Sequence, residues 1–131
     1  MNQELHEIRT LWIPFTFPGL NEVVTTCKGQ WGKHKYHKLK ADYEGAVIAL
    51  AKSKRFETIT VPVNIDFIWC EPDKRRDPDN IAAGGRKIIL DALVYGGFMQ
   101  GDGWGNVLGF SDSFRVNKDE KGVLISFKKG E

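Results

Sequence analysis

The strongest structural constraint in this sequence is an alternation over residues 59–69, with an apolar side chain at every second position. Side chains of a strand point alternately to the two faces of a sheet, so the pattern predicts a half-buried strand. Thr60, Asn64 and Asp66 are among the polar positions. The apolar positions are Ile59, Val61, Val63, Ile65, Phe67 and Trp69.

A helix is predicted soon after this strand, over residues 78–95. Pro78 suits the first helical position, Asp77 suits the N-cap, and Gly96-Gly97 suits the end. The glycine pair 84–85 inside the helix costs roughly 1–2 kcal/mol relative to alanines. We therefore expect either a close approach by backbone or ligand at this pair, or a break in the helix. One polar face of the helix carries Asn80, Gly84, Lys87 and Asp91.

The remaining elements follow from periodicity and turn residues. We expect a strand near residues 8–15, a proline-broken loop up to about residue 21, and a helix over 35–54. Two further strands, over 106–116 and 122–128, are expected to form a hairpin with loop 117–121. The order of elements predicts an α+β fold, with a small mixed sheet and two main helices packed on one face.

The bulk composition fits one domain covering residues 1–131. The chain is 41% hydrophobic and 27% charged, which allows a core and disfavours a membrane span. Cys27 and Cys70 are far apart and form no CxxC pair, which favours two reduced thiols. No secretory signal is recognisable, and we expect a cytoplasmic protein without membrane contact.

Positive charge is concentrated in residues 28–55. Eight Lys/Arg against two acids give this segment a net charge of +6, whereas the whole chain carries +2. Such a local field fits a polyanion, although a solvated lysine-rich helix face is the common alternative. Trp31 and Tyr36 are candidates for stacking on bases, with core packing as the preferred role. The residues expected to contact DNA phosphates are Lys33, Lys35, Lys38, Arg75 and Arg76.

Acidic residues follow the basic run 74–76. Asp77 and Asp79 lie two residues apart at a strand-to-helix turn, and Lys87 lies two turns further along. Carboxylates suit Mg²⁺ or Mn²⁺, and lysine suits a phosphate. Asp102 follows in a glycine-rich loop, and spacing alone does not bring it to the other two acids. Each residue also has a plainer explanation, namely helix cap, solvent lysine or turn residue.

The combination resembles the RusA-type Holliday junction resolvases, especially forms carried by phages and prophages. Their pattern is basic residues, then D-x-D-N, then K-x-x-x-D-A-L, then a glycine and an acidic pair. The matching segments here are residues 75–80, 87–93 and 97–102. The resemblance implies a homodimeric Mg²⁺-dependent endonuclease, with Mn²⁺ as a substitute. Such an enzyme nicks opposed strands of four-way or branched DNA in recombination and repair.

The resemblance also implies roles for individual residues. Asp77, Asp79 and Asp102 would hold the metal, and Lys87 would be the catalytic lysine. Asn80 and Asp91 are expected to contact these residues and hold them in position, without binding the metal themselves.

Two departures from the family pattern are visible. Gly101 replaces the first member of the acidic pair, and about one extra helical turn separates Asn80 from Lys87. The missing acid leaves open an alternative, a catalytically inactive protein that binds branched DNA with a degraded metal site. A small phosphohydrolase acting on nucleotides is a weaker alternative.

Overall fold

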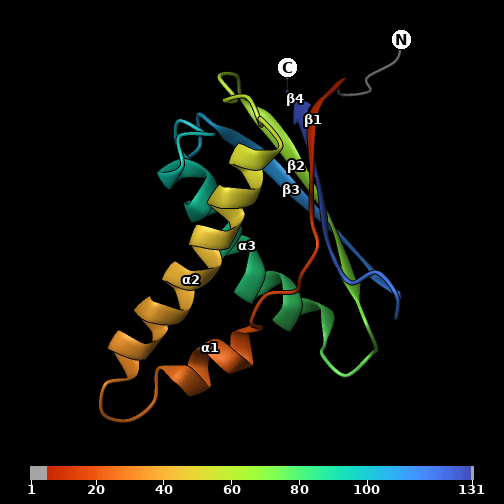
Figure 1. Ribbon diagram of the computed structural model, residues 1–131. Coiled ribbons are helices and arrows are strands. Elements are labelled where there is room, and N and C mark those ends of the chain that lie inside the picture. The colour runs from red at the N-terminus through yellow and green to blue at the C-terminus, as the bar shows by residue number, and fades with distance from the viewer. Residues whose placement is uncertain (1–5, 131) are drawn as a thin grey trace.

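A computed structural model describes residues 6–130 (Figure 1). It contains four strands and three helices. In chain order they are β1 (His6–Ile13), α1 (Leu20–Thr26), α2 (Gly32–Ser53), β2 (Val63–Glu71), α3 (Pro78–Tyr95), β3 (Val107–Val116) and β4 (Gly122–Lys129).

The predicted α+β fold is confirmed. The strands form one mixed sheet in the order β1-β4-β2-β3, and α2 and α3 lie on the same side of it (Figure 1). The alternation in β2 is the reason for this arrangement. Val63, Ile65, Phe67 and Trp69 are at most 1% exposed, whereas the residues between them are partly exposed. One face of β2 therefore belongs to the core beneath the helices.

The alternating stretch extends further in sequence than the strand does in the structure. β2 begins at Val63, so the prediction of a strand from residue 59 was wrong at its start. Ile59 forms only an isolated bridge to Met99 and is buried there. Pro62 has no backbone N–H to donate to a neighbouring strand, which accounts for the late start.

The predicted hairpin between the last two strands was also wrong. β3 pairs in parallel with β2, and β4 pairs antiparallel with the other edge of β2. Because α3 crosses over between β2 and β3, those two strands run in the same direction. The loop 117–121 then crosses the end of β2, where the Asn117 N–H donates to the Glu71 carbonyl at 2.8 Å.

The segment expected to be a loop contains the short helix α1. Gly19 precedes it, and the Glu22 side chain accepts a hydrogen bond from the Gly19 N–H at 3.1 Å. This backward contact satisfies a free backbone donor at the helix start. The helix packs against both α2 and α3.

Both glycines within α3 are closely approached, Gly84 by backbone as predicted and Gly85 by a side chain. A Cβ at Gly84 would overlap the carbonyl oxygen of Pro18, and one at Gly85 would lie 2.7 Å from the Trp69 ring. The helix continues through both positions without a break. The segment before α1 thus crosses α3 in direct backbone contact.

The helices within residues 6–130 are all too short or too polar to cross a membrane.

Candidate functional site

The acidic start of α3 is the centre of the predicted site. Asp77 is the N-cap residue, with φ −75° and ψ 148°, yet its side chain makes no capping hydrogen bond. Asp79 lies in the first turn, and its Oδ1 accepts a hydrogen bond from the Asn80 N–H at 2.9 Å. Both aspartates are exposed. The structural role considered for Asp77, a cap for the helix, is therefore not what its side chain does here.

Asp77 lines a surface pocket of ≈ 290 Å³ at the ends of β2 and β3. Lys74 and Arg115 line the same pocket, together with Phe114 and Val116 from the edge of the sheet. Glu71, Asp73 and Arg76 also line it, so the unshared carboxylate of Asp77 lies among both acidic and cationic side chains. Lys74 and Arg115 are suited to bind an anionic group, and the carboxylates are suited to bind a cation beside it.

Arg76 is held inside the protein rather than presented to solvent. Its guanidinium donates to both carboxylate oxygens of Glu71, at 3.0 and 2.9 Å, and to Glu22 at 3.0 Å. It also donates to the Phe17 carbonyl at 2.7 Å. These bonds tie the end of β2 to the segment before α1, one residue away from Asp77.

Sequence reasoning missed this network, although one signal was available. Glu71 continues the alternation of β2 on its buried face and is only 7% exposed. A buried carboxylate needs a cationic partner, and the next arginines along the chain are Arg75 and Arg76.

The predicted polar face of α3 meets other elements rather than an open cleft. The Asn80 Oδ1 accepts the Asn21 N–H at 2.7 Å, and Gly84 is covered by the segment at Pro18. Asp91 faces α2. Asn80 and Lys87 do share one side of the helix, but the chain before α1 crosses between them.

Lys87 lies beside Asp91, as the four-residue spacing predicts. The Lys87 Nζ is 3.1 Å from Asp91 Oδ1, and the lysine side chain is 63% exposed. Lys40 of α2 is closer, with its Nζ 2.5 Å from Asp91 Oδ2. Burial raises the pKa of Asp91, but hydrogen bonds from Lys40 and Lys87 outweigh it and hold the pKa below its ordinary value.

Glu44 completes this cluster between the two long helices. Its Oε2 is buried and finds no hydrogen-bond partner within residues 6–130. Burial raises the pKa of Glu44, against the opposing positive charge of Lys40.

Asp102 is not brought to the other two aspartates within one chain. It lines a surface hollow with Val107 and Leu108, at the start of β3, whereas Asp77 lies near the end of that strand. Figure 1 shows the loop before β3 and the start of α3 at opposite ends of α3. An 18-residue helix is about 27 Å long, too far for a loop movement to close. Asp102 therefore does not join Asp77 and Asp79 in the described chain, as the predicted three-acid pocket requires.

The side chains within residues 6–130 form no group of three His, Cys, Asp or Glu placed to hold a metal ion. Asp77 and Asp79 supply two carboxylates at one place. The third aspartate of the predicted ligand set lies elsewhere, in the hollow beside Val107.

The basic residues at the start of α2 are free to meet a partner. Lys33, Lys35 and Lys38 are exposed, and so is Arg75 beside the acidic site. Trp31 is 67% exposed, so the preferred core role for this side chain was wrong. The starts of α2 and α3 lie toward the same end of the molecule, with α1 between them (Figure 1).

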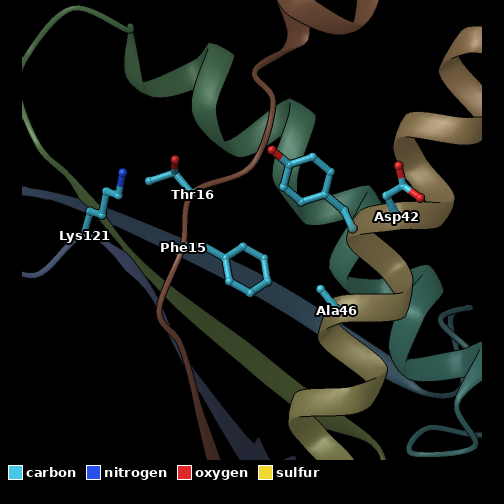
Figure 2. A pocket seen from close by; sticks show the side chains of 6 residues that line it. Phe15, Thr16, Asp42, Ala46 and Lys121 are labelled. Atoms are coloured by element: carbon cyan, nitrogen blue, oxygen red, sulfur yellow. The ribbon is translucent and has the colours of Figure 1, made fainter.

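A separate groove lies between α2 and the segment before α1 (Figure 2). Asp42 and Lys121 stand at its two sides, with Phe15 and Thr16 between them. The rings of Phe15 and Tyr43 are 6.2 Å apart at their centroids. None of the predicted site residues belongs to this groove.

A comparison with models of known protein families found no match, and no curated protein matched the chain.

Proposed function

We propose that this chain is a metal-dependent endodeoxyribonuclease that nicks four-way or branched DNA as a homodimer, the activity implied by its resemblance to RusA-type resolvases. The observation that carries the proposal is the carboxylate of Asp77. It begins a helix without capping it, and it lines a pocket with Lys74 and Arg115. Phosphodiester cleavage needs an activated water and relief of negative charge, and carboxylates that hold a metal beside cationic side chains can serve both needs.

The proposed division of roles follows the contacts of each residue. Asp77 and Asp79 supply carboxylates at the reacting phosphate, where a bound Mg²⁺ or Mn²⁺ would supply an activated water and relief of charge. Arg76 positions the turn that carries Asp77, through its bonds to Glu71 and Glu22. The predicted phosphate contact of Arg76 is therefore omitted from the proposal.

The proposed DNA surface combines the start of α2 with the start of α3. Lys33, Lys35, Lys38 and Arg75 are exposed and contact the phosphate backbone in this proposal. Trp31 stands at the same end of α2, where an exposed indole suits stacking on an unpaired base.

The test is a nicking assay on a synthetic four-way DNA junction with Mg²⁺ or Mn²⁺. Asp77→Asn and Asp79→Asn should abolish nicking while junction binding is kept or improved, because a negative charge near phosphate is removed. Asp42→Asn, an exposed acid on α2, is the matched control and should cut like the wild type. Normal nicking by both site variants would contradict the proposal.

A second candidate function is binding of branched DNA without catalysis. Within residues 6–130 no three acids are placed to hold a metal ion, which favours this candidate, as does Gly101 in place of an acid. Purified protein that holds junctions tightly and never nicks them, over a range of both metal ions, would support this alternative.

A further inference from the structure

Trp31, between α1 and α2, is held in an unusual backbone conformation. Its φ is 69° and its ψ is 8°, in the left-handed region that bulky residues rarely adopt. Its side chain is 67% exposed, so packing in the core does not account for this conformation. Strained residues of this kind cluster at sites that bind ligands. The indole is therefore a candidate for a ligand contact.

The turn before α2 leaves the chain little freedom around Trp31. Gly29 also has a positive φ, 79°, and its carbonyl accepts the Gly32 N–H at 3.2 Å. A Cβ at Gly32 would lie 2.1 Å from the carbonyl oxygen of Cys27, so the backbone closes tightly here. The Trp31 carbonyl then accepts the Lys35 N–H at 2.9 Å as the helix begins. The indole is thus carried on a tight turn, which lowers the cost of ordering it when a ligand binds.

A surface pocket of ≈ 570 Å³ lies beside the indole, a size within the usual range of ligand pockets. His34 and His37 line it together with Trp31 and Lys33. Steps of three residues place the indole and the two exposed imidazoles on one side of the helix. The pocket therefore combines one indole, two imidazoles and one ammonium group.

The surroundings of the pocket favour a negatively charged ligand. Lys33 lines it, and Lys35 and Lys38 are exposed on the same part of α2. The first turn of α2, which the structure describes in full, carries no acidic side chain. Acidic groups near the start of a helix are stabilising, so the place that they usually take is open to a phosphate. The pocket thus joins an aromatic surface to a positive field.

An aromatic surface beside cations is the combination that binds a nucleotide. Bases of any sequence stack on aromatic side chains, and lysines attract the phosphates. In a duplex both faces of a base are covered by its neighbours, and only the edges are accessible in the grooves. Stacking on Trp31 therefore needs a nucleotide that is unpaired.

We propose that the pocket of Trp31, His34 and His37 binds one unpaired nucleotide of single-stranded DNA, with the base on the indole and its phosphate beside Lys33. The imidazole nitrogens offer hydrogen bonds to the edge of the base. Binding in this pocket needs no metal ion. Its use at branched DNA rests on the proposed function, because the starts of α2 and α3 lie toward the same end of the molecule (Figure 1). The affinity for a single strand does not rest on it.

A short labelled single strand of about six nucleotides tests the pocket in EDTA, where metal-dependent cutting is blocked. Fluorescence anisotropy gives its dissociation constant. Trp31→Ala should raise this constant by about tenfold or more, because one base–indole contact is lost, and Trp31→Phe should restore most of the affinity. Tyr95→Ala, at a 76% exposed aromatic position at the end of α3, is the matched control and should bind like the wild type. Wild-type affinity in Trp31→Ala, or no binding by the wild type at high micromolar concentration, overturns the proposal.

A strand of the same length without bases shows whether the indole meets a base. The wild type should bind this abasic strand at least about tenfold more weakly than the complete strand. Trp31→Ala should bind both strands equally, because the two changes remove the same contact and their effects do not add. If Trp31→Ala weakens binding of the abasic strand by the same factor as that of the complete strand, the indole does not contact a base.

A closed hairpin duplex separates stacking from attraction to phosphate. Lys33→Gln should weaken binding of the single strand and of the duplex alike, since both carry phosphates. Trp31→Ala should weaken binding of the single strand alone. Equal losses of Trp31→Ala on both kinds of DNA contradict the requirement for an unpaired base.

Trp31→Gly keeps the test decisive if Trp31→Ala folds poorly. Glycine adopts a positive φ without steric cost, so this variant should unfold at no lower temperature than the wild type. It should nevertheless bind the single strand as weakly as Trp31→Ala. Circular dichroism measures the thermal unfolding. A Trp31→Gly protein that is less stable than the wild type would show that the indole supports the fold, and its assignment to a ligand would be wrong.

The two proposals fail in different ways. A wild type that stacks a base on Trp31 and never cuts DNA contradicts the proposed function and supports the pocket. A wild type that cuts junctions, while Trp31→Ala keeps its full affinity for single strands, supports the function and contradicts the pocket.

Discussion

Lys40 Nζ lies 2.5 Å from Asp91 Oδ2, and this ion pair joins the two long helices α2 and α3. Both side chains are largely buried, with 18% and 15% of their surface exposed. The pair is flanked by the more exposed Lys87 on the same carboxylate. Asp91 was expected to support the catalytic residues, and its contacts give it a role in holding the helices together.

Asp91→Asn should lower the free energy of unfolding by about 2 kcal/mol, because the partly buried Lys40 loses its hydrogen-bonded carboxylate and keeps only the attraction of Glu44. Urea unfolding followed by circular dichroism measures the change. Lys87→Gln removes only the exposed partner and should cost less than about 0.5 kcal/mol. Equal losses in the two variants would contradict this assignment.

The contribution of Asp91 should depend on pH in a defined direction. Its pKa is lower in the folded protein than the ordinary value of about 3.9. The unfolded chain therefore binds the proton first, and the stabilisation is complete above that value. It is lost as the pH falls through the folded pKa. Unfolding of wild type and Asp91→Asn should thus converge in acid and differ fully near neutrality.

The stability contribution of Glu44 should depend on pH in the opposite direction, because burial raises the pKa of this carboxyl. Its stabilising contribution is present below the ordinary value of about 4.3 and is lost as the pH rises through the folded pKa. Glu44→Gln should therefore raise stability near neutral pH and have little effect in acid. A loss of stability at neutral pH would show that the attraction to Lys40 dominates instead.

Glycine substitutions in the two long helices should have opposite effects. Gly84→Ala should destabilise the protein by about 2 kcal/mol, because the added methyl overlaps the carbonyl of Pro18. Gly45→Ala in α2 meets no atom within 4 Å and should stabilise by about 1 kcal/mol through helix propensity alone. Thermal and urea unfolding of both variants measure the difference. A stable Gly84→Ala protein would mean that the segment before α1 is free to move away from α3.

The parts of the fold that follow from local patterns were predictable. The alternation in β2 and the proline and glycines that bound α3 gave the correct types of element and, for α3, the correct ends. The pairing of the last two strands was not predictable in this way. Two strands joined by a short polar loop usually form a hairpin, and the fact that β2 lies between them depends on the crossover through α3.

In the candidate site, too, local features were predictable and long-range contacts were not. Asp77 was expected at the N-cap and stands there, but only the three-dimensional contacts show that its side chain is not used as a cap. Arg76 and Arg75 are adjacent in sequence, yet one is bound to Glu71 and the other is exposed. The distance between Asp77 and Asp102 depends on α3 and β3 running the length of the sheet, which residue spacing does not reveal.

Arg76 and Arg75 should therefore respond differently to substitution. Arg76→Ala should cost about 3 kcal/mol of stability, because the buried Glu71 loses its partner. Arg75→Ala should leave stability nearly unchanged, since the side chain is exposed and its pairing with Asp73 is at the surface. Urea unfolding separates the two. Similar losses for both arginines would contradict the structural role of Arg76.

The exposed lysines at the start of α2 give the last prediction, which concerns salt. Each lysine that neutralises a DNA phosphate contributes about 0.9 to the slope of log affinity against log salt. Replacing Lys33, Lys35 and Lys38 by Gln should therefore reduce the slope for junction binding by up to about 3. Lys52→Gln, at the far end of the same helix, removes an equal charge per site and should leave the slope unchanged. Fluorescence anisotropy between low and moderate salt measures both, and an unchanged slope in the triple variant would show that DNA meets another face of the protein.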